Sequence, residues 1–283
     1  MEYTKVRNIK IPKLGFGSWL IGDNPDEKQR EIATFEYGYK NHQMTLIDTA
    51  EMYGSGNSEK VVGDYVKGRK RDEFFIVDKI LPSNAEKGLY EERCRNSLKI
   101  MGLDYFDLYL LHWKSHVNLQ EMVDNMEHLK ELGLIKEWGV SNFDVPQMEE
   151  LFKCRNGDKC FANQCLFNLN ARGVEFDLIP WCQSHDVLFM AYSPLGNNKI
   201  DREKITNNAI FKELAIKNGY TPSSLMLAFA IREDKAMAIF KTSSTAHLNE
   251  NMYNVFKPID EKLYADINNI FPKTKVKKRL ETI

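Results

Sequence analysis

Short runs of hydrophobic residues recur along the chain at intervals of roughly 25 to 35 residues. The runs begin at Leu14, Thr45, Phe74, Phe106, Ile135, Phe161, Val187 and Ala236. Several of them are almost continuously apolar rather than alternating, which is typical of parallel strands that are covered on both faces. We therefore predict eight buried, parallel β-strands.

Segments with the period of an amphipathic helix lie between these strands, clearest at residues 58–68, 90–102, 119–133 and 222–233. The alternation predicts an α/β protein with a closed (β/α)8 TIM barrel, because crossover helices keep parallel strands adjacent and closure removes the sheet edges. An open, doubly wound sheet is the alternative. The early glycine cluster LGFGSWLIG argues against that sheet, since it lacks the GxGxxG pattern of dinucleotide-binding folds.

No linker rich in Pro, Gly or Ser interrupts the chain, so we expect residues 1–283 to form one barrel domain. The segment YTKVRNIKIPKLG, which precedes the first barrel strand, is expected to form a β-hairpin that plugs the bottom of the barrel.

Several residues mark the expected ends of helices. Asn57 or Ser58 can cap the second helix, and Thr221 followed by Pro222 places proline at a first helical position. Glycines at the ends of the helical segments are expected to stop them, at Gly68, Gly102 and Gly133.

Composition narrows the range of functions. The formal net charge is −1, so neither a nucleic-acid surface nor an anionic membrane is an expected partner. With 43% hydrophobic residues, the composition is typical of a folded globular protein. The five cysteines have no CxxC or histidine spacing, which argues against a disulfide framework or a zinc site.

No leader-like or membrane-length apolar stretch is present, and we expect a cytoplasmic protein, monomeric or weakly oligomeric. The basic C-terminal stretch, residues 273–279, is expected to be a solvated tail.

Polar residues at strand ends carry the candidate chemistry, because TIM-barrel active sites lie at the C-terminal ends of the strands. Asp48 ends the second strand and Tyr53 follows in its loop. Lys79 lies near the end of the third strand, and His112 closes the fourth. Each of these residues alone is compatible with a purely structural role, whereas four on three successive strands favour a catalytic site.

Buried charges are costly unless paired, so Asp48 and Lys79 are expected to form an ion pair. The Lys79 ammonium would favour the phenolate of Tyr53, and we expect it to lower the pKa of this tyrosine. Tyr53 then becomes a general acid, and His112 can hydrogen-bond the oxygen of a carbonyl group.

The segments LIDTAEMYGSG, FFIVDKI, FDLYLLHW, WGVSNF and AYSPLG resemble those of the aldo-keto reductases. The similarity covers almost the whole chain and is closest to short bacterial members of the methylglyoxal reductase type, through IDTAEMY, LLHW and IPWCQ. In this family an Asp, a Tyr, a Lys and a His act together, and they match Asp48, Tyr53, Lys79 and His112.

The resemblance also implies NADPH, bound in extended form across the barrel mouth. Ser141, Asn142 and Gln164 would hold the nicotinamide carboxamide, and Tyr192 would stack on the nicotinamide ring. The remaining expected cofactor contacts are Gly17, Ser18 and Trp19 after the first strand, Ser193 and Leu195 beside the pyrophosphate, Lys241, Thr242 and Ser244 around the 2′-phosphate, and Glu250 and Asn251 near the adenine.

One position departs from the family pattern. Many relatives carry an arginine that grips the 2′-phosphate, and this chain has His247 there. Histidine lacks the bidentate fork of a guanidinium, so we expect a weaker preference for NADPH over NADH, with Lys241 as the main phosphate contact and NADH as a usable cofactor.

The expected reaction is hydride transfer from the nicotinamide to an aldehyde or ketone, with Tyr53 as proton donor. Trp19, Met52 and Trp113 are expected to line the substrate pocket, an apolar wall that suits small carbonyls or dicarbonyls such as methylglyoxal. Two alternatives stay open: a lyase that uses Lys79 as a Schiff base, and a regulatory, cofactor-sensing subunit of the same fold.

Overall fold

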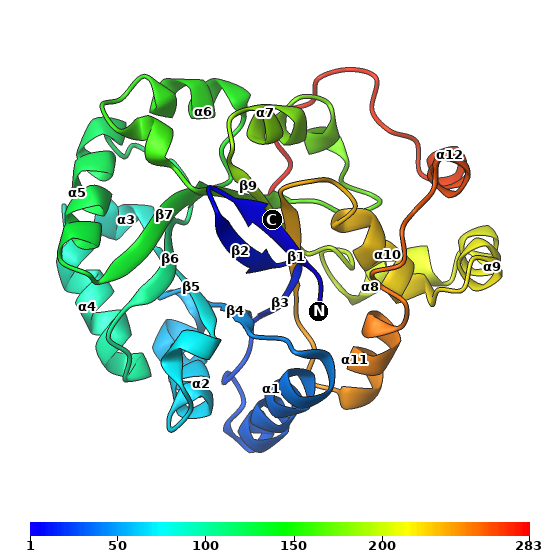
Figure 1. Ribbon diagram of the computed structural model, residues 1–283, viewed down its shortest axis with the longest axis horizontal. Coiled ribbons are helices and arrows are strands. Elements are labelled where there is room, and N and C mark those ends of the chain that lie inside the picture. Colours follow the sequence, from blue (N-terminus) through cyan, green and yellow to red (C-terminus); the bar gives the residue numbers. More distant parts are fainter.

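Eight parallel strands form a closed barrel in the computed structural model, which describes residues 1–283 (Figure 1). The strands follow one another around the barrel in chain order, and the last pairs with the first. They are β3 (Leu14–Gly17), β4 (Leu46–Asp48), β5 (Phe75–Ile80), β6 (Phe106–Leu111), β7 (Ile135–Ser141), β8 (Ala162–Leu166), β9 (Leu188–Tyr192) and β10 (Ala236–Phe240). The predicted barrel is confirmed, and each of the eight predicted runs supplies one strand.

A hairpin of two antiparallel strands, β1 (Tyr3–Val6) and β2 (Ile9–Pro12), precedes the barrel, as predicted. Arg7 and Asn8 at its tip have φ angles of 46° and 69°, the left-handed pair that a two-residue hairpin turn requires. The hairpin lies across one end of the barrel in Figure 1. Val6 and Ile11 are fully buried against the residues that fill the barrel interior, so the hairpin closes this end.

Helices surround the barrel and cover the outer faces of its strands (Figure 1). They are α1 (Lys28–His42), α2 (Asn57–Val66), α3 (Pro82–Ala85), α4 (Tyr90–Met101), α5 (Leu119–Glu131), α6 (Val145–Phe152), α7 (Leu178–Ser184), α8 (Lys199–Thr206), α9 (Ala209–Lys217), α10 (Pro222–Ala230), α11 (Thr245–Met252) and α12 (Glu261–Ile270). None of these helices has both the length and the hydrophobicity that crossing a membrane requires.

The helix ends follow the sequence signals with one exception. Thr221 caps α10 through the Ser224 N–H, and Gly102 ends α4 at a φ of 66°. The cap predicted for α2 is wrong, because the N-cap residue is Gly56 and no side chain caps this helix. The Ser58 hydroxyl is used elsewhere: its single proton is shared between two main-chain carbonyls in the loop after β3, at 2.7 and 2.9 Å.

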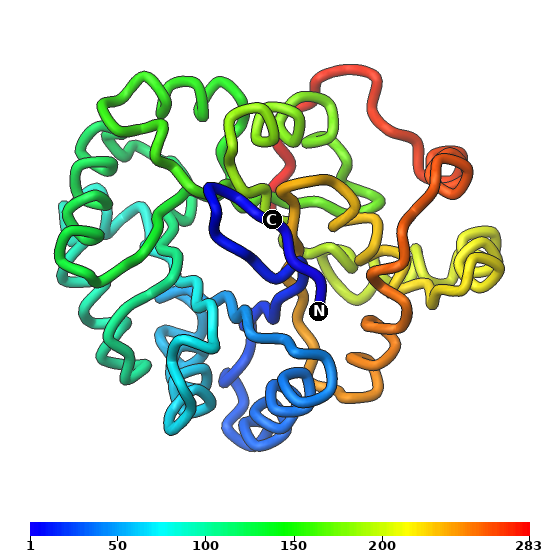
Figure 2. Tube along the Cα trace, in the orientation of Figure 1, coloured from blue at the N-terminus to red at the C-terminus, as the bar shows by residue number.

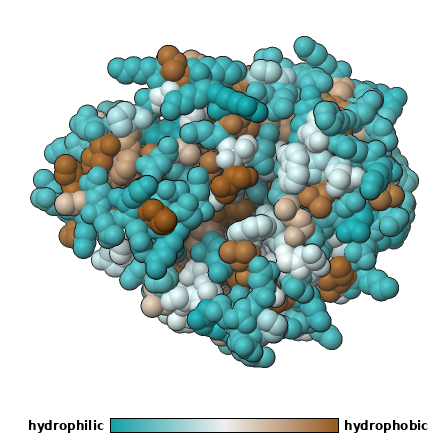
Figure 3. Space-filling view, turned by 180° about the vertical axis from the view of Figure 1, so that it is seen from behind, coloured by the Kyte–Doolittle hydropathy of each residue, from teal (hydrophilic) through white to brown (hydrophobic).

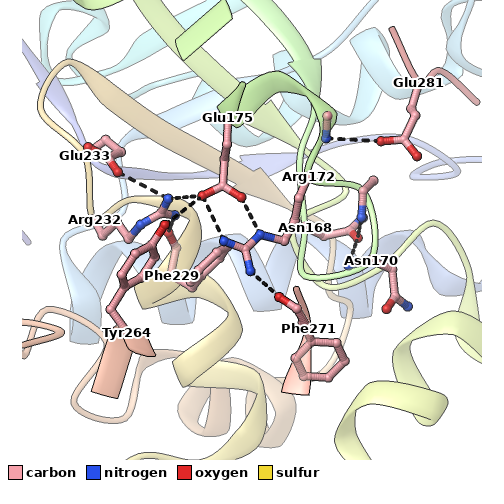
Figure 4. A network of polar contacts seen from close by, with 12 residues as sticks. Asn168, Asn170, Arg172, Glu175, Phe229, Arg232, Glu233, Tyr264, Phe271 and Glu281 are labelled. Carbon is pink, nitrogen blue, oxygen red and sulfur yellow. Dashed lines mark hydrogen bonds and ion pairs between the residues drawn. The ribbon is translucent and has the colours of Figure 1, made fainter. Parts of the chain in front are cut away.

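A buried polar network joins the loop after β8 to α10 and the C-terminal segment (Figure 4). The carboxylate of Glu175 accepts hydrogen bonds from the guanidinium groups of Arg172 and Arg232. Arg172 also donates to the main-chain carbonyl of Phe271, just after α12. Both arginines lie over the ring of Phe229. The network therefore fixes where the C-terminal tail leaves the helical ring.

The tail then returns from α12 towards the barrel axis, as the red segment of Figure 2 shows. Lys277 pairs with Asp177 at 2.8 Å, and the Glu281 carboxylate accepts from the Gly173 N–H at 3.3 Å. The basic side chains of residues 273–279 are exposed, as predicted, but the tail that carries them is anchored to the barrel.

Candidate active site

The register of three neighbouring strands brings the predicted catalytic residues together. Each strand carries a residue of the barrel interior two positions before a candidate residue: Leu46, Val77 and Leu110. Because side chains alternate between the faces of a strand, Asp48, Lys79 and His112 also point into the barrel, one layer nearer its C-terminal end. This end lies opposite the hairpin.

Lys79 and Asp48 form the predicted ion pair, with 2.5 Å between Lys79 Nζ and Asp48 Oδ1 and at most 1% of either side chain exposed. The Lys79 ammonium also donates to the Thr49 carbonyl at 2.7 Å and lies 3.4 Å from the Tyr53 hydroxyl oxygen. Gln164 donates to the second carboxylate oxygen of Asp48 at 2.7 Å. Each buried charge therefore has a charged partner and a second polar partner, as buried ion pairs require.

The titration of this pair follows from burial and mutual attraction. Burial lowers the pKa of Lys79, but the attraction of the Asp48 carboxylate, assisted by Tyr53 and Asp78, outweighs burial, and the pKa of Lys79 lies above its ordinary value. Lys79 is therefore a stable cation at neutral pH. Burial also raises the pKa of Asp48, and Lys79 and Gln164 offset part of that rise.

Tyr53 begins the short 3-10 helix η2 (Tyr53–Gly56), which leaves its ring close to the ion pair. The expected lowering of its pKa is wrong. Burial raises the pKa of Tyr53 above its ordinary value, and the attraction of Lys79 offsets only part of the effect. The phenol consequently keeps its proton at neutral pH, and Lys79 makes the phenolate less unfavourable than burial alone would.

His112 lies edge-on to the Tyr53 ring, with 5.8 Å between the ring centroids. Burial, assisted by the charge of Lys79, lowers the pKa of His112 to about 3. The imidazole is therefore neutral at physiological pH, so it can donate one hydrogen bond without carrying a charge. Its main-chain carbonyl accepts from the Asn142 side chain at 3.2 Å.

The three residues expected to hold the carboxamide, and the tyrosine expected to stack on the nicotinamide ring, lie on or just after the next strands, at the same barrel end. Ser141 donates to the Gln164 carbonyl at 2.8 Å, and Tyr192 donates through its hydroxyl to Asn142 Oδ1 at 2.9 Å. Asn142 adopts a φ of 60°, which turns the chain at the end of β7. The four residues thus form one connected set that reaches Asp48 through the Gln164 side chain.

The other residues expected to contact the cofactor near the barrel mouth differ in how deeply they are buried. Gly17 ends β3 and Ser18 is fully buried, whereas half of the Trp19 side chain is exposed. Ser193 turns the chain after β9 at a φ of 50°, and Leu195 is buried behind it.

Apolar side chains surround the mouth of the barrel. Trp19 packs edge-on against Tyr53, with 4.9 Å between centroids, and Trp113 lies beside His112. Met52 precedes Tyr53 and is half-buried. The face opposite the hairpin is hollowed near its centre, and hydrophobic side chains gather around the hollow (Figure 3). The C-terminal residue reaches the same end, since the main chain of Ile283 lies next to the Tyr192 hydroxyl.

A second cavity, of about 480 Å³, lies among α8, α9, α10 and α11, and no hydrophobic residue lines it. Five of the residues expected near the adenosine phosphate line this cavity: Lys241, Thr242, His247, Glu250 and Asn251. Ser244 does not line it, because its hydroxyl caps α11 by accepting from the His247 N–H at 3.3 Å.

Sequence reasoning missed two groups of residues. Arg202 on α8 and Lys212 on α9 line the second cavity. In the sequence they are separated from Lys241 by about the length of a whole βα unit. The main-chain carbonyl of Thr49 accepts a hydrogen bond from the Lys79 ammonium. A pattern of side chains in the sequence cannot predict such a main-chain acceptor. Between β9 and α10 the sequence has five Lys or Arg residues and three Asp or Glu residues, which is only a weak signal for the first group.

Comparison with known proteins agrees with this geometry. The model of the Aldo/keto reductase family matches residues 13–271. The chain is 36% identical to the methylglyoxal reductase YeaE of Escherichia coli, over 98% of this chain and 96% of that protein. It is also similar to a crystal structure of an aldo-keto reductase from Klebsiella pneumoniae in complex with NADPH, with 36% identity, complete coverage of both chains and a TM-score of 0.94.

A second solved relative, the thermostable aldo-keto reductase Tm1743 in complex with the inhibitor epalrestat, is 31% identical with a TM-score of 0.84, over 95% of this chain and all of that one. The chain belongs to the aldo/keto reductase family and is an oxidoreductase.

The buried ion pair generates a prediction about stability. Replacing Lys79 by Met removes the cation and leaves Asp48 charged in an apolar interior, which should reduce the free energy of unfolding by about 3–5 kcal/mol. The double substitution Asp48→Asn with Lys79→Met should recover part of this loss, because no buried charge remains. Urea denaturation monitored by circular dichroism measures both.

Arg155→Met is the matched control, since it breaks an ion pair with Asp124 whose side chains are 75% and 44% exposed. It should cost less than about 1 kcal/mol. An equal loss in Lys79→Met and Arg155→Met would contradict the importance assigned to the buried pair.

Proposed function

We propose that this protein reduces small aldehydes, ketones or dicarbonyls to alcohols with NADPH, and that Tyr53 is the general acid. The observation that carries the proposal is the hydroxyl of Tyr53, 3.4 Å from an ammonium that is itself fixed by Asp48 and Thr49. A neutral phenol beside a permanent cation is suited to giving a proton to a developing alkoxide.

The residues at the barrel mouth fit a phosphorylated nicotinamide dinucleotide. The Ser141 hydroxyl and the Asn142 amide can exchange their present hydrogen bonds for those of a carboxamide. Gln164 can accept through its side-chain oxygen while its N–H group stays on Asp48, and the Tyr192 face can stack on a flat ring. The polar second cavity, with Lys241 in its wall, fits the adenosine phosphate. The bound cofactor supplies the hydride, which reaches the carbonyl carbon.

The protein's own residues then have distinct roles. His112, neutral at working pH, donates a hydrogen bond to the carbonyl oxygen and orients it towards Tyr53. Tyr53 gives its proton to that oxygen as negative charge develops. Lys79 stabilises the resulting phenolate, and Asp48 keeps Lys79 protonated and in position. The later return of a proton to Tyr53 restores the starting state.

The apolar mouth supports small, uncharged substrates. Trp19, Met52 and Trp113 present aromatic and thioether surface beside Tyr53 and His112, which favours small carbonyl compounds over large charged ones. Methylglyoxal fits this description, and it is the substrate named for the relative YeaE.

The two other functions considered for this site are less well supported. A Schiff-base lyase needs a lysine that loses its proton readily, whereas the Asp48 carboxylate raises the pKa of Lys79. A purely regulatory subunit has no need of a phenol held next to a buried Lys–Asp pair, and this chain keeps that arrangement intact.

Replacing Tyr53 by Phe tests the role of the hydroxyl. Turnover of aldehydes should fall roughly a hundredfold to ten-thousandfold, because general acid catalysis is lost. NADPH affinity, measured by fluorescence titration, should not change, since the hydroxyl acts on the substrate. Reduction at the native rate by Tyr53→Phe would refute the assignment.

Replacing Lys241 by Met tests the phosphate contact. NADPH binding should weaken roughly tenfold to a hundredfold, because charged hydrogen bonds contribute about 1.5–3 kcal/mol, and NADH binding should remain as it was. His247→Arg should strengthen NADPH binding by adding a bidentate donor. Calorimetric titration of each variant with both cofactors measures this. Equal losses for the two cofactors in Lys241→Met would mean that the lysine supports the loop instead.

A further inference from the structure

The polar cavity beside the barrel has two walls that come from distant parts of the chain. The loop after β10 and helix α11 supply one wall, and α8 with α9 supplies the other. Figure 1 shows α8, α10 and α11 on the same side of the barrel. Thr221, at the start of α10, donates to the Glu250 carbonyl at 2.7 Å and so fixes α10 against α11. The cavity is therefore held open by packed helices.

Three basic side chains line this cavity. They are Arg202 on α8, Lys212 on α9 and Lys241 after β10, and none of them forms an ion pair or a side-chain hydrogen bond within the chain. Glu250 is the only carboxylate in the lining, and Glu31 attracts Lys241 only from a greater distance. Like charges around one cavity repel each other, and a bound anion relieves that repulsion.

We propose that Arg202 and Lys212 form the second half of a clamp for the 2′-phosphate of NADPH, opposite Lys241. The inference rests on the proposed function, since it takes NADPH as the cofactor. The 2′-phosphate carries close to two negative charges at neutral pH, which three converging cations can balance. Arg202 supplies the guanidinium fork that His247 does not offer. The preference for NADPH is therefore strong despite the histidine.

The lining identifies which phosphate group belongs here. None of Asp48, Tyr53, Lys79 and His112 lines this cavity, so the cavity lies away from the reacting end of the cofactor. Glu250 and Asn251 add a carboxylate and an amide, which suit the amino group and ring nitrogens of adenine. An anion bound beside adenine and far from the nicotinamide is the phosphate on the adenosine ribose.

The test uses the full chain with both cation residues of the second wall replaced, Arg202→Met with Lys212→Met. The control is Lys204→Met with Lys217→Met, which removes the same charge from the same two helices at exposed positions outside the lining. Dissociation constants for NADPH and NADH are measured by calorimetric titration without any carbonyl substrate. Adenosine 2′-monophosphate and adenosine serve as a second pair of probes.

The clamp predicts that the double variant loses NADPH affinity by roughly tenfold or more, with NADH affinity unchanged. The loss should be the same for adenosine 2′-monophosphate and absent for adenosine. The control should bind all four compounds like the native protein. The inference is overturned if the double variant binds NADPH like the control, or if its affinities for NADPH and NADH fall together.

This result is separable from the fate of the proposed function. If the native protein binds NADPH selectively through these residues but reduces no carbonyl, the clamp is supported and the proposed reductase function is refuted. If the native protein reduces carbonyls and the double variant still prefers NADPH, only the clamp is refuted.

Discussion

The ion pair between Lys79 and Asp48 is the interaction on which the rest of the site depends. Two charges can be buried in the barrel only because each has a charged partner and a further polar partner, Thr49 for the lysine and Gln164 for the aspartate. Gln164 in turn belongs to the set of polar residues that ends at Tyr192. The pair therefore connects the proton donor to the residues proposed to hold the cofactor.

Burial acts on the site residues in a way that serves the proposed chemistry. It keeps the proton on Tyr53 and removes the charge from His112, whose pKa falls to about 3. It leaves Lys79 charged because Asp48 is beside it. The site thus presents one neutral acid, one neutral hydrogen-bond donor and one cation, and the helical ring and the N-terminal hairpin pack around the barrel that carries them.

The barrel and its inner ring of candidate residues were predictable from the sequence, because apolar runs mark the strands and the alternation of side chains decides which residues point inward. The raised pKa of Tyr53 was not, since the extent of burial depends on how Trp19 and the loop after β4 pack. Arg202 and Lys212 were missed for a related reason. Helices α8 and α9 lie outside the regular strand-helix alternation, and only tertiary packing brings them to Lys241.

Steady-state oxidation of NADPH at 340 nm, with methylglyoxal and a panel of small aldehydes, tests the central claim most directly when the native protein is compared with Asp48→Asn. The native protein should turn over at least one of these carbonyls. Asp48→Asn should bind NADPH normally and lose roughly a hundredfold or more in kcat, since Lys79 is then no longer held charged and in place beside Tyr53. No oxidation by the native protein with any of these compounds, or an unchanged kcat in Asp48→Asn, would contradict the account.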